Sequence, residues 1–560
     1  MVPDSAAPPA RAADRSSPVV ESSRWLWLIV AVAAVLRLFP IWFGLPYLHA
    51  RPDEGAAIGH AMAMLEGDLN PHFFHWPSLI FYVFAILFWV ASAVRGLFAA
   101  DGSLTSAEQI LVGRAFVALA GTLTVVVAFR LARRTADTST GLLAAGFLAV
   151  ALLHVRDSHF AMTDVVMTLL VTTSLALVLR ALDKAMTAPA IGAIPLGGFA
   201  LAGLAGGLAA STKYSAAAVV VSMAAAHVLM LARFRQMPWN PRTWLPSVAF
   251  LAGVAGGFLA ATPYAVLDFE KFSADLRFDF THLSGGHGLN LGRGWIYHLT
   301  HSLPYGAGVL TFLAASVGVV PLVRQYPRHA FVIGSFAAAF YASIGSGYTV
   351  FFRYVLPLIP IACLSAAIAV RHAGPWIARR GGVSTGAAIL VLGSLVAAPS
   401  LVHSIWFDVV LARKDTRVLA AEWLAPRIRT GETLYDSGGD YGMLDLGRRG
   451  HHVWRFDPST GSFGHPEGHT PDWLVLHRSP VRTYANHAPG LRRLAHERYD
   501  LVWEVRATRG AAGAAVYDLQ DAFFMPLSDF DTVARPGPTI RIYRFRKGDS
   551  HIWSPRGGQM

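Results

Sequence analysis

The chain has 560 residues, of which 54% are hydrophobic and only 15% are charged, and its mean hydropathy is +0.43. Soluble proteins average about 25% charged residues, and the apolar runs here approach the roughly 20 residues that cross a bilayer. The net charge of +12 does not indicate nucleic-acid binding, because the arginines cluster between apolar runs, as in cytoplasmic loops. The single Cys363 excludes an intrachain disulfide and favours a small buried hydrophobe. A polytopic α-helical membrane protein is therefore predicted.

The N-terminus combines a polar tail with an apolar run. Residues 1–23 are rich in Pro, Ala and Ser, which predicts a disordered cytoplasmic tail. The run 25–48 is too long for the core of a signal peptide and is followed by no clear cleavage site, so we interpret it as a retained first span. Arg11, Arg15 and Arg24 favour a cytoplasmic N-terminus.

Residues 24–408 are predicted to form the transmembrane domain. Further spans are expected at 110–130, 141–155, 163–180, 194–211, 215–232, 244–264, 304–323, 329–345, 350–370 and 383–404. The Gly-rich spans LAGLAGGLAAS and AFLAGVAGGFLA predict close helix packing through small residues. Arginine-dense connections such as FRLARRTADTST and VRHAGPWIARRGG are expected inside; RDSHFAMTD, STKYS, 265–303 and GSGYTVFFR are expected outside.

Residues 78–99 are long enough to span, yet counting them as a span would invert every later loop and violate the positive-inside bias five times. We therefore predict a helix that lies at the outer interface or re-enters the membrane, with its aromatic residues at headgroup level. This gives about eleven spans and an outside C-terminus. An ordinary twelfth span remains the alternative.

Residues 409–560 have a different character and predict a small extracytoplasmic α/β domain. KDTRVLAAEWLAPRI has helical spacing, and strand-like runs follow in ETLYDS, DWLVLHR, LVWEVRA and TIRIYRF, separated by turn residues. No catalytic motif is evident in this region.

The first outer loop, RPDEGAAIGHAMAMLEGDLNPHFFHWP, carries acids and histidines directly after an apolar span. Ionisable groups near the membrane are costly to desolvate and often functional, although a solvated loop is the simpler alternative. On the predicted topology, polar residues of several distant loops converge on the outer face. They are Arg51, Asp53, Glu54, His72, His75, Arg156, Asp157, His159, Asp164, Lys213, Tyr214 and Arg353.

Carboxylates and cations at one interface suit a reaction between an anionic lipid-linked donor and a neutral nucleophile. A carboxylate accepts the proton of an attacking hydroxyl or amine, while Arg and Lys hold a phosphate as it leaves. Simpler roles are open: His159 as a helix cap, Lys213 and Arg353 as snorkelling side chains, Asp164 as a helix N-terminal acid. No zinc-type spacing of His or Cys is present, so no metal and no other cofactor is predicted.

The order of motifs resembles the GT-C membrane glycosyltransferases, specifically bacterial relatives of protein O-mannosyltransferases and of the lipid A aminoarabinose transferase. The matching pieces, within about residues 25–405, are PDEG, NPHFFHWPSLIFY, HFAMTDVVMTLL, LAASTKYSAAAVV and FRYVLPLIPIA. The resemblance implies an inverting transferase of the bacterial cytoplasmic membrane that uses a polyprenyl-phosphate sugar at the outer face. Asp53 would be the general base, Glu54 would support it, and Asp164 would orient the acceptor or neighbouring groups.

The resemblance makes Lys213 and Arg353 candidates for the donor phosphate, and Tyr214 is expected beside them. From the converging loops, Arg156, Asp157 and His159 are expected to bind the acceptor or to support the site. One motif departs from the family: Trp76 stands where some relatives have Lys before the proline, and Ser78 replaces the second proline. This leaves His72, His75 and Arg51 as alternative phosphate contacts. The acceptor, a protein, lipid or glycan, is left open.

Two other functions compete with the transferase. A transporter or lipid-linked sugar flippase should show internal repeats or polar residues near the midplane, whereas here the ionisable residues lie mainly at span ends on one side and no repeat is evident. A structural or assembly protein is the third hypothesis, and the sequence alone does not decide against it.

Overall fold

The computed structural model describes residues 18–98, 102–447, 452–457, 459, 462–463, 469–485, 487–510, 515–546 and 548. Its helices are α1 (Pro18–Leu38), α2 (Glu54–Leu65), α3 (Leu79–Gly96), α4 (Ser106–Thr135), α5 (Thr138–Val150), α6 (Leu152–Ser158), α7 (Asp164–Thr187), α8 (Leu196–Ala210), α9 (Val219–Phe234), α10 (Leu245–Ala261), α11 (Tyr264–Leu267), α12 (Phe269–Gly285), α13 (Gly294–Tyr297), α14 (Leu303–Ala307), α15 (Val309–Gln325), α16 (Pro327–Gly345), α17 (Ile359–Gly381), α18 (Thr385–Leu411), α19 (Thr416–Leu424), α20 (Gly439–Gly442) and α21 (Pro489–Arg498).

Short helical turns connect several of these helices: η1 (Ile191–Ala193), η2 (Tyr214–Ala218), η3 (Pro241–Trp244), η4 (His298–Ser302), η5 (Phe352–Leu358) and η6 (Phe530–Thr532). The strands all lie in the C-terminal region: β1 (Thr433–Asp436), β2 (His452–Val453), β3 (Phe456–Asp457), β4 (Ser462–Phe463), β5 (Trp473–Arg478), β6 (Tyr499–Val505) and β7 (Thr539–Phe545).

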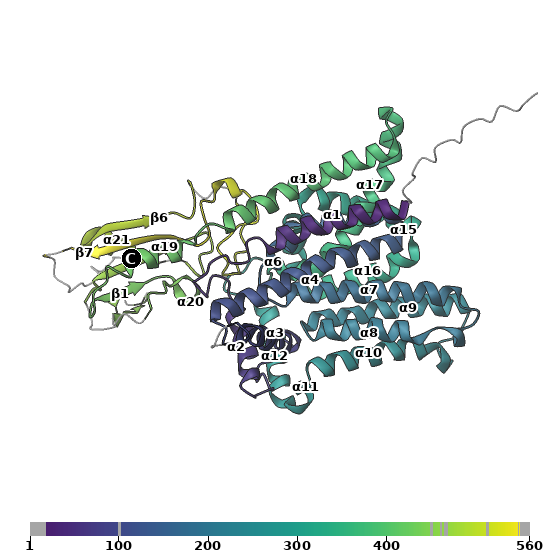
Figure 1. Ribbon diagram of the computed structural model, residues 1–560, viewed down its shortest axis with the longest axis horizontal. Helices are drawn as coiled ribbons and strands as arrows, with labels where there is room; N and C mark the ends of the chain where they lie inside the picture. Colours follow the sequence, from purple (N-terminus) through teal and green to yellow (C-terminus); the bar gives the residue numbers. More distant parts are fainter. Residues whose placement is uncertain are drawn as a thin grey trace, which may run out of the picture.

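Helices α4, α7 and α9 run along the long axis of a bundle that has the C-terminal sheet at one end (Figure 1). In the described part of the chain, seven helices are long and apolar enough to span a membrane, or up to nine if each of two bent pairs is one span. The chain is a multi-pass membrane protein. All eleven predicted segments contain helices, but the count of eleven is not confirmed, since α8, for example, has only 15 residues.

Both ends of the first predicted span differ from expectation. Of the predicted disordered tail, residues 1–17 lie outside the described residues, whereas residues 18–23 already belong to α1. At the other end α1 stops at Leu38 instead of reaching residue 48. The reason is local: Pro40 and Pro46 lack the backbone N–H that a continuing helix needs, and each disfavours helical backbone in the residue before it.

Glycine sets two features of the bundle. At Gly203 of α8 an added Cβ would lie 1.9 Å from the carbonyl oxygen of Phe250 in α10, so the close packing predicted for these spans is confirmed. At Gly308 the backbone has a φ of +91°, and α14 and α15 meet there in a bend; the whole helical stretch 294–307 lies at 113° to α15. The predicted span 141–155 is also broken, by a 59° bend between α5 and α6.

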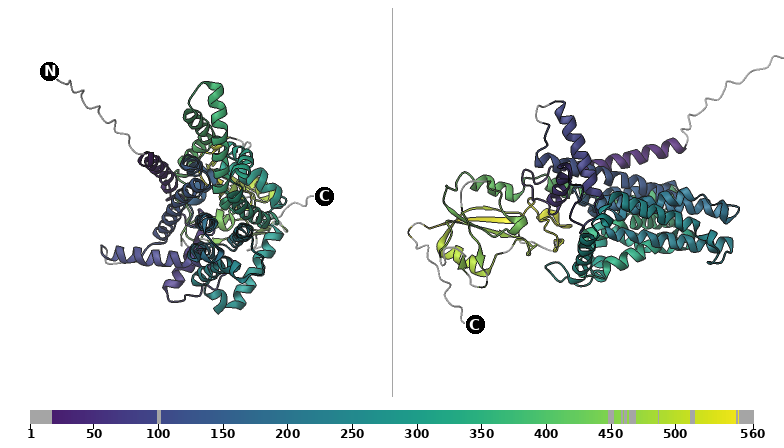
Figure 2. Two further views of the ribbon diagram at one scale, coloured as in Figure 1. Left: turned by 90° about the vertical axis from the view of Figure 1, so that its right-hand side faces the viewer. Right: turned by 90° about the horizontal axis from the view of Figure 1, so that it is seen from below.

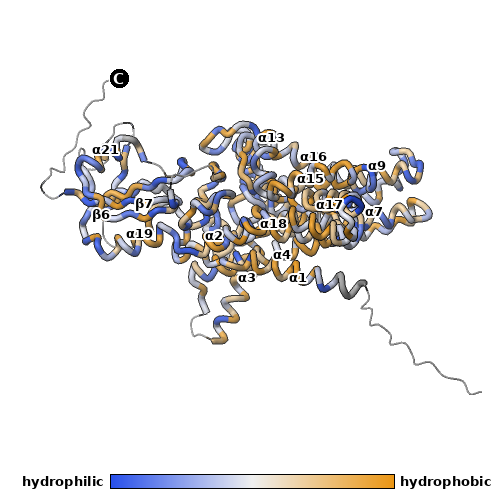
Figure 3. Tube along the Cα trace, turned by 90° about the horizontal axis from the view of Figure 1, so that it is seen from above, coloured by the Kyte–Doolittle hydropathy of each residue, from blue (hydrophilic) through white to orange (hydrophobic). Residues whose placement is uncertain are grey.

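Helix α3 runs across the bundle and projects from its side (Figure 2). One face, with Phe81, Phe84 and Phe88, is buried, while Trp89 on the other face is 65% exposed. This is the orientation that an interfacial helix requires, although the length and composition of α3 also fit a span. In the view coloured by hydropathy, hydrophobic residues follow the bundle, and hydrophilic ones are frequent around the strands of the C-terminal region and at the opposite end of the bundle (Figure 3).

The C-terminal sheet has five strands in the order β2-β1-β5-β7-β6. Strand β5 pairs with β1 in parallel and with β7 antiparallel. Because side chains alternate along a strand, Trp473 of β5 packs with α19 on one face and Leu474 packs with α21 on the other. The sheet is therefore covered by a helix on each face.

Between β6 and β7 the chain leaves the sheet and returns to the helical bundle. The Phe523 ring packs 4.8 Å from the Phe160 ring and 5.9 Å from the Phe43 ring, centroid to centroid. Phe530 lies 6.1 Å from Phe407 of α18. We call residues 515–533 the return segment. Five of its side chains belong to the same core as the membrane helices, so the C-terminal region is not a detached module. They are Phe523, Met525, Leu527, Phe530 and Val533.

Candidate functional site

A cavity of about 820 Å³ opens at the end of the bundle that faces the C-terminal sheet. Loops far apart in sequence line it, including the first outer loop, the start of α7, the STKYS loop, α12, η5 and the return segment. We call it the central cavity. The sequence-predicted residues that line it are Asp53, His75, Asp164, Lys213, Tyr214 and Arg353.

Asp53 is the N-cap residue of α2 and has a φ of +70°, which non-glycine residues seldom adopt. Its side chain is 31% exposed in the described structure, and Oδ2 lies 3.6 Å from Nη2 of Arg353. Strained backbone of this kind persists where the surrounding structure enforces it, often at functional sites. The first-loop carboxylate is thus accessible and directed toward a cation.

Asp164 begins α7, as predicted, and is buried. Its Oδ1 accepts a hydrogen bond from Nζ of Lys213 at 2.5 Å. The same ammonium lies 4.6 Å from the centroid of the Tyr354 ring, within range of a cation–π interaction. The side chain of Lys213 is therefore held in the lining of the cavity by Asp164 and Tyr354, rather than extending freely to the membrane interface.

Arg353 connects three carboxylates. Its guanidinium atoms lie 3.3 Å from Asp521, 3.6 Å from Asp53 and 4.0 Å from Asp164. The guanidinium also stacks on Phe351, with Cζ 4.1 Å from the ring centroid. Its Nη1 makes no hydrogen bond in the described structure. A planar, rigid donor in this setting is well suited to an anionic oxygen.

Asp521, from the return segment, was not predicted as a site residue. Its Oδ1 accepts a hydrogen bond from Arg51 at 2.5 Å, and its Oδ2 accepts one from Arg156 at 3.1 Å. Burial alone would raise the pKa of Asp521, but Arg51, Arg353 and Arg156 outweigh it and hold that pKa well below its usual range. The neighbouring Asp518 has a raised pKa, because it is buried close to the charge of Asp521.

His75 and α12 form another part of the wall. The ring Nδ1 of His75 lies 3.0 Å from Oδ1 of Asp279. Burial raises the pKa of Asp279 to about 6, in spite of the opposing effect of His75. Tyr214 donates a hydrogen bond to the carbonyl of Phe74 at 2.7 Å, which fixes the NPHFFHW loop against η2.

The wall nearest the sheet contains further residues that sequence reasoning missed. The hydroxyl of Tyr484 lies 2.7 Å from Nε2 of His287, whose Nδ1 lies 3.2 Å from His282. Gln520 uses its side-chain oxygen to accept from the backbone N–H of Val350 at 2.7 Å. No spacing in the sequence marks Tyr484 or Gln520, because they reach the cavity only through the return of the C-terminal region to the bundle.

Glu54 does not line the central cavity. It is fully buried, and its two oxygens accept hydrogen bonds from Nε and Nη2 of Arg114 at 2.8 and 2.6 Å. It also accepts from the backbone N–H of Ala161 at 2.8 Å. These contacts tie α2 to α4 and to the loop before α7, and the predicted support of Asp53 by Glu54 stays a prediction.

Five further residues that were expected to converge on the outer face do not line the central cavity. His72 is 62% exposed and pairs with Asp68 at 3.0 Å, outside the cavity lining. His159 contacts the carbonyl oxygens of Val155 and Phe39, both at 2.9 Å, as a structural histidine would. The remaining three, Arg51, Arg156 and Asp157, are buried behind the cavity rather than in its lining.

No group of three or more His, Cys, Asp and Glu side chains within the described ranges is arranged to hold a metal ion. Among the described residues, the lysine and arginine side chains that line the central cavity are those of Lys213 and Arg353. An anionic group that enters the cavity would therefore meet protein cations.

A family model described as Dolichyl-phosphate-mannose-protein mannosyltransferase matches residues 88–263. No curated protein matches the chain. Among solved structures, the oligosaccharyltransferase of Archaeoglobus fulgidus tethered to an acceptor peptide is similar, with a TM-score of 0.53 at 11% identity, over 93% of this chain and 75% of that one. The chain has the GT-C fold.

The same oligosaccharyltransferase in its apo form has a TM-score of 0.50 at 11% identity, over 77% of this GT-C chain and 64% of the other. The chain thus spans less than two thirds of the length of the apo oligosaccharyltransferase. ArnT from Cupriavidus metallidurans in the apo state has a TM-score of 0.49 at 16% identity, over 93% and 98% of the two chains. The family model includes Asp164 and Lys213 but stops short of Asp53 and Arg353.

Proposed function

We propose that this chain is an inverting glycosyltransferase. It moves a hexosyl or pentosyl group from a polyprenyl-phosphate donor to an acceptor at the outer face of a bacterial cytoplasmic membrane. The description of the matching family model names a lipid-phosphate-linked sugar, which supports a donor of this class. In this proposal the N-terminus is cytoplasmic and the C-terminal sheet lies outside.

One observation carries the proposal: the accessible carboxylate of Asp53 and the guanidinium of Arg353 lie 3.6 Å apart at the same cavity. A base for the nucleophile and a cation for the phosphate are the two groups that the reaction requires. Lys213 supplies a second cation in the lining of the same cavity.

The reaction is written as a single displacement. Asp53 accepts the proton of the acceptor hydroxyl or amine as its oxygen or nitrogen attacks the anomeric carbon. The bond between that carbon and the phosphate oxygen breaks, and the electron pair leaves with the polyprenyl phosphate. Arg353 and Lys213 stabilise the growing charge on this phosphate. Attack from the face opposite the leaving group inverts the anomeric configuration.

The cavity also offers an apolar side to the lipid. Helix α12 contributes Phe278 and Phe280, which are 58% and 67% exposed, and α16 contributes Ile344. Large exposed aromatic residues beside a cavity at a membrane surface suit contact with an acyl or prenyl chain. We therefore place the prenyl chain between α12 and α16, with its phosphate toward Arg353.

The proposed mechanism uses no divalent metal, because Arg353 and Lys213 take the phosphate charge. Transfer should therefore continue after chelation with EDTA. Loss of transfer with EDTA and its recovery on adding Mg²⁺ or Mn²⁺ would show that a metal shares this task.

The decisive experiment is transfer of radiolabelled sugar from polyprenyl-phosphate donors in membranes that contain the wild type or Asp53→Asn at equal expression. The matched control is Asp68→Asn, an exposed acid of the same loop that lies outside the cavity lining. We expect transfer to be lost in Asp53→Asn and kept in Asp68→Asn. Equal transfer in all three proteins would remove Asp53 from the mechanism. Absence of transfer by well-folded wild type with every donor would argue against a transferase.

A further inference from the structure

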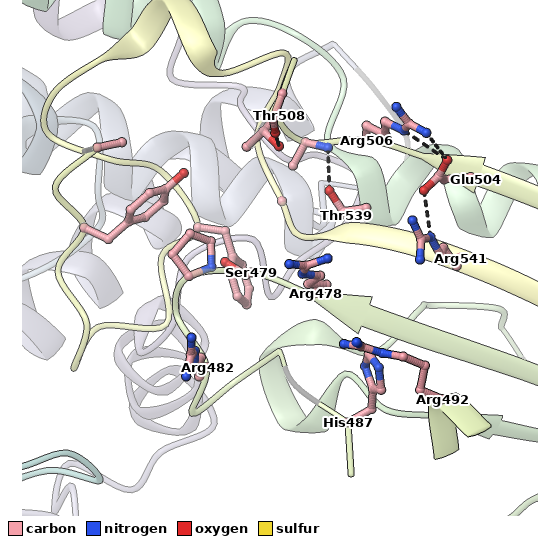
Figure 4. Close-up of a pocket in the computed structure, with 17 residues that line it drawn as sticks. Arg478, Ser479, Arg482, His487, Arg492, Glu504, Arg506, Thr508, Thr539 and Arg541 are labelled. Carbon is pink, nitrogen blue, oxygen red and sulfur yellow. Dashed lines mark hydrogen bonds and ion pairs between the residues drawn. The ribbon is translucent and has the colours of Figure 1, made fainter. Parts of the chain in front are cut away.

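A second cavity, of about 1110 Å³, lies in the C-terminal region (Figure 4). All its lining residues come from residues 478–541, so the membrane helices contribute none. The lining contains five arginines and one acid, Glu504. We call it the arginine cavity. Its arginines are Arg478, Arg482, Arg492, Arg506 and Arg541.

Glu504 forms ion pairs with two of the five arginines. Its carboxylate lies 3.0 Å from Nη2 of Arg506 and 2.7 Å from Nε of Arg541. The other three arginines form no ion pair with an acid among the described residues. Like charges that share a concave surface without counter-charges repel one another and create a positive potential. Such a surface is stabilised when an anion enters it.

The three unpaired arginines are held by different elements. Arg478 ends β5, where it pairs with Thr539 of β7 in the sheet register. Arg482 lies in the loop after β5, and Arg492 is on α21. Figure 4 shows their side chains around the space that the cavity occupies. Because a strand, a loop and a helix each provide one guanidinium, the charges are distributed over the cavity rather than collected at one point.

The two cavities share a wall. The loop after β5 gives Arg482 to the arginine cavity and Tyr484 to the central cavity. In the return segment, Tyr517 and Phe524 line the arginine cavity, whereas Asp521 lines the central one. A small apolar core that includes Tyr517 and Phe524 joins the loop to the return segment. A ligand of the arginine cavity is therefore adjacent to the site of the chemistry.

We propose that the arginine cavity binds a phosphate- or carboxylate-bearing segment of the acceptor, whose nucleophilic group then reaches Asp53. This inference rests on the proposed function. The donor phosphate already has Arg353 and Lys213 beside the apolar wall, whereas the arginine cavity is built from the region outside the bundle. Its volume of about 1110 Å³ is close to the upper limit of about 1,000 Å³ for small-molecule sites, so the cavity has room for an extended segment.

The first test is binding of sodium tripolyphosphate, a simple polyanion, to the full-length protein in detergent, measured by calorimetry. The variant is Arg478→Gln/Arg482→Gln/Arg492→Gln, and the matched control is Arg493→Gln, the next residue of α21, which does not line the cavity. We expect the triple variant to bind about tenfold more weakly or worse, and the control to bind like the wild type. Equal binding by wild type and triple variant, or no binding by the wild type, would overturn the proposal.

The second test is kinetic and separates the acceptor from free phosphate compounds. In a transfer assay with membrane acceptor fractions, the triple variant should raise the KM for the acceptor and leave the KM for the donor and kcat unchanged. Tripolyphosphate should compete with the acceptor in the wild type and lose this effect in the variant. Tripolyphosphate binding that never affects the acceptor KM would identify a site for free phosphate compounds and refute the acceptor role. The calorimetry does not depend on transfer activity. Binding of tripolyphosphate without any transfer would therefore count against the proposed function, whereas transfer without binding of tripolyphosphate would count against the role of the arginine cavity.

Discussion

Nη1 of Arg353, at the start of η5, lies 3.3 Å from Oδ2 of Asp521 in the return segment. This ion pair joins the membrane bundle to the C-terminal region at the edge of the central cavity. Asp521 also contacts Arg51 and Arg156, so one carboxylate balances arginines from three other parts of the chain. The C-terminal region is thereby part of the site.

Asp521→Asn should strongly destabilise the protein. The substitution leaves three arginines without their shared counter-charge, and breaking a buried ion pair from one side costs about 3–5 kcal/mol. Thermal unfolding in detergent should show a large drop in Tm, and hydrogen exchange should rise in the return segment. Asp531→Asn, at an exposed acid nearby, is the control. An unchanged Tm would mean that the other carboxylates near these arginines, such as Asp53 beside Arg353 and Asp157 beside Arg156, are sufficient counter-charges.

Arg353→Lys should fold and yet lose most of its transfer activity. A lysine keeps the charge but has neither the planar fork that reaches several oxygens nor the flat face that stacks on Phe351. We expect kcat/KM for the donor to fall by about tenfold or more, as expected when a charge-assisted hydrogen bond is lost. Arg293→Lys, at an arginine outside the cavity lining, controls for the substitution. Normal kinetics in Arg353→Lys would assign the donor phosphate to another group.

Glu54→Gln should behave differently from Asp53→Asn. It removes the charge that pairs with Arg114 in a fully buried site, so we expect a loss of about 3–5 kcal/mol of stability. Molecules that remain folded should retain most of their specific activity. Thermal unfolding measures the loss of stability. Transfer activity divided by the amount of folded protein measures the specific activity. Full stability combined with lost transfer would restore Glu54 to the chemistry.

The pair of Glu432 and Arg544 predicts a pH dependence in the C-terminal sheet. Hydrogen bonds from Arg544 lower the pKa of Glu432 from 4.5 to about 2. A carboxylate with a lowered folded pKa contributes stability above pH 4.5 and loses it as the pH falls toward 2. Because the pair is partly exposed, we expect Glu432→Gln to lose about 1 kcal/mol at neutral pH.

Hydrogen exchange of β7 amides, followed from about pH 7 to about pH 3, measures this contribution. The difference between wild type and Glu432→Gln should narrow as the pH decreases. Glu422→Gln, at an exposed surface pair with Lys414, should show little difference at any pH. A difference for Glu432→Gln that stays constant with pH would indicate packing instead of charge.

The orientation of α3 can be tested by cysteine labelling in intact cells. Asp68→Cys and Ser106→Cys place an exposed thiol before and after α3, and the native Cys363 is buried. For an interfacial helix, a membrane-impermeant maleimide should label both positions from outside. If α3 crosses the membrane, only one of the two positions should be labelled, and the topology of the later loops would invert.

Local sequence patterns were enough to predict the helical membrane class, and the resemblance of the motif series predicted the GT-C fold. Asp53 and Asp164, two of the residues named from the sequence, line the central cavity. An apolar run predicts burial of its own residues, and a run rich in small residues predicts a close helix contact, because both signals are contained in one continuous segment. The partner of that contact, Phe250 in the case of Gly203, is known only from the structure. Strands β1, β5, β6 and β7 of the C-terminal sheet overlap the four predicted runs, whereas β2 was not predicted. The ends of helices were predicted less accurately: α1 ends at Leu38, just before Pro40, and not at residue 48.

Tertiary structure alone decided which charged residues face the cavity and which are buried behind it. Glu54 and Asp53 are adjacent in sequence, yet one pairs with Arg114 in the core and the other lines the cavity. Asp521 and the arginine cavity had no local signature. Asp521 contacts Arg51 and Arg156, which lie hundreds of positions away, and the arginine cavity joins a strand, a loop and a helix of the C-terminal region. Contacts between such separate elements leave no periodic or spaced pattern in a single sequence.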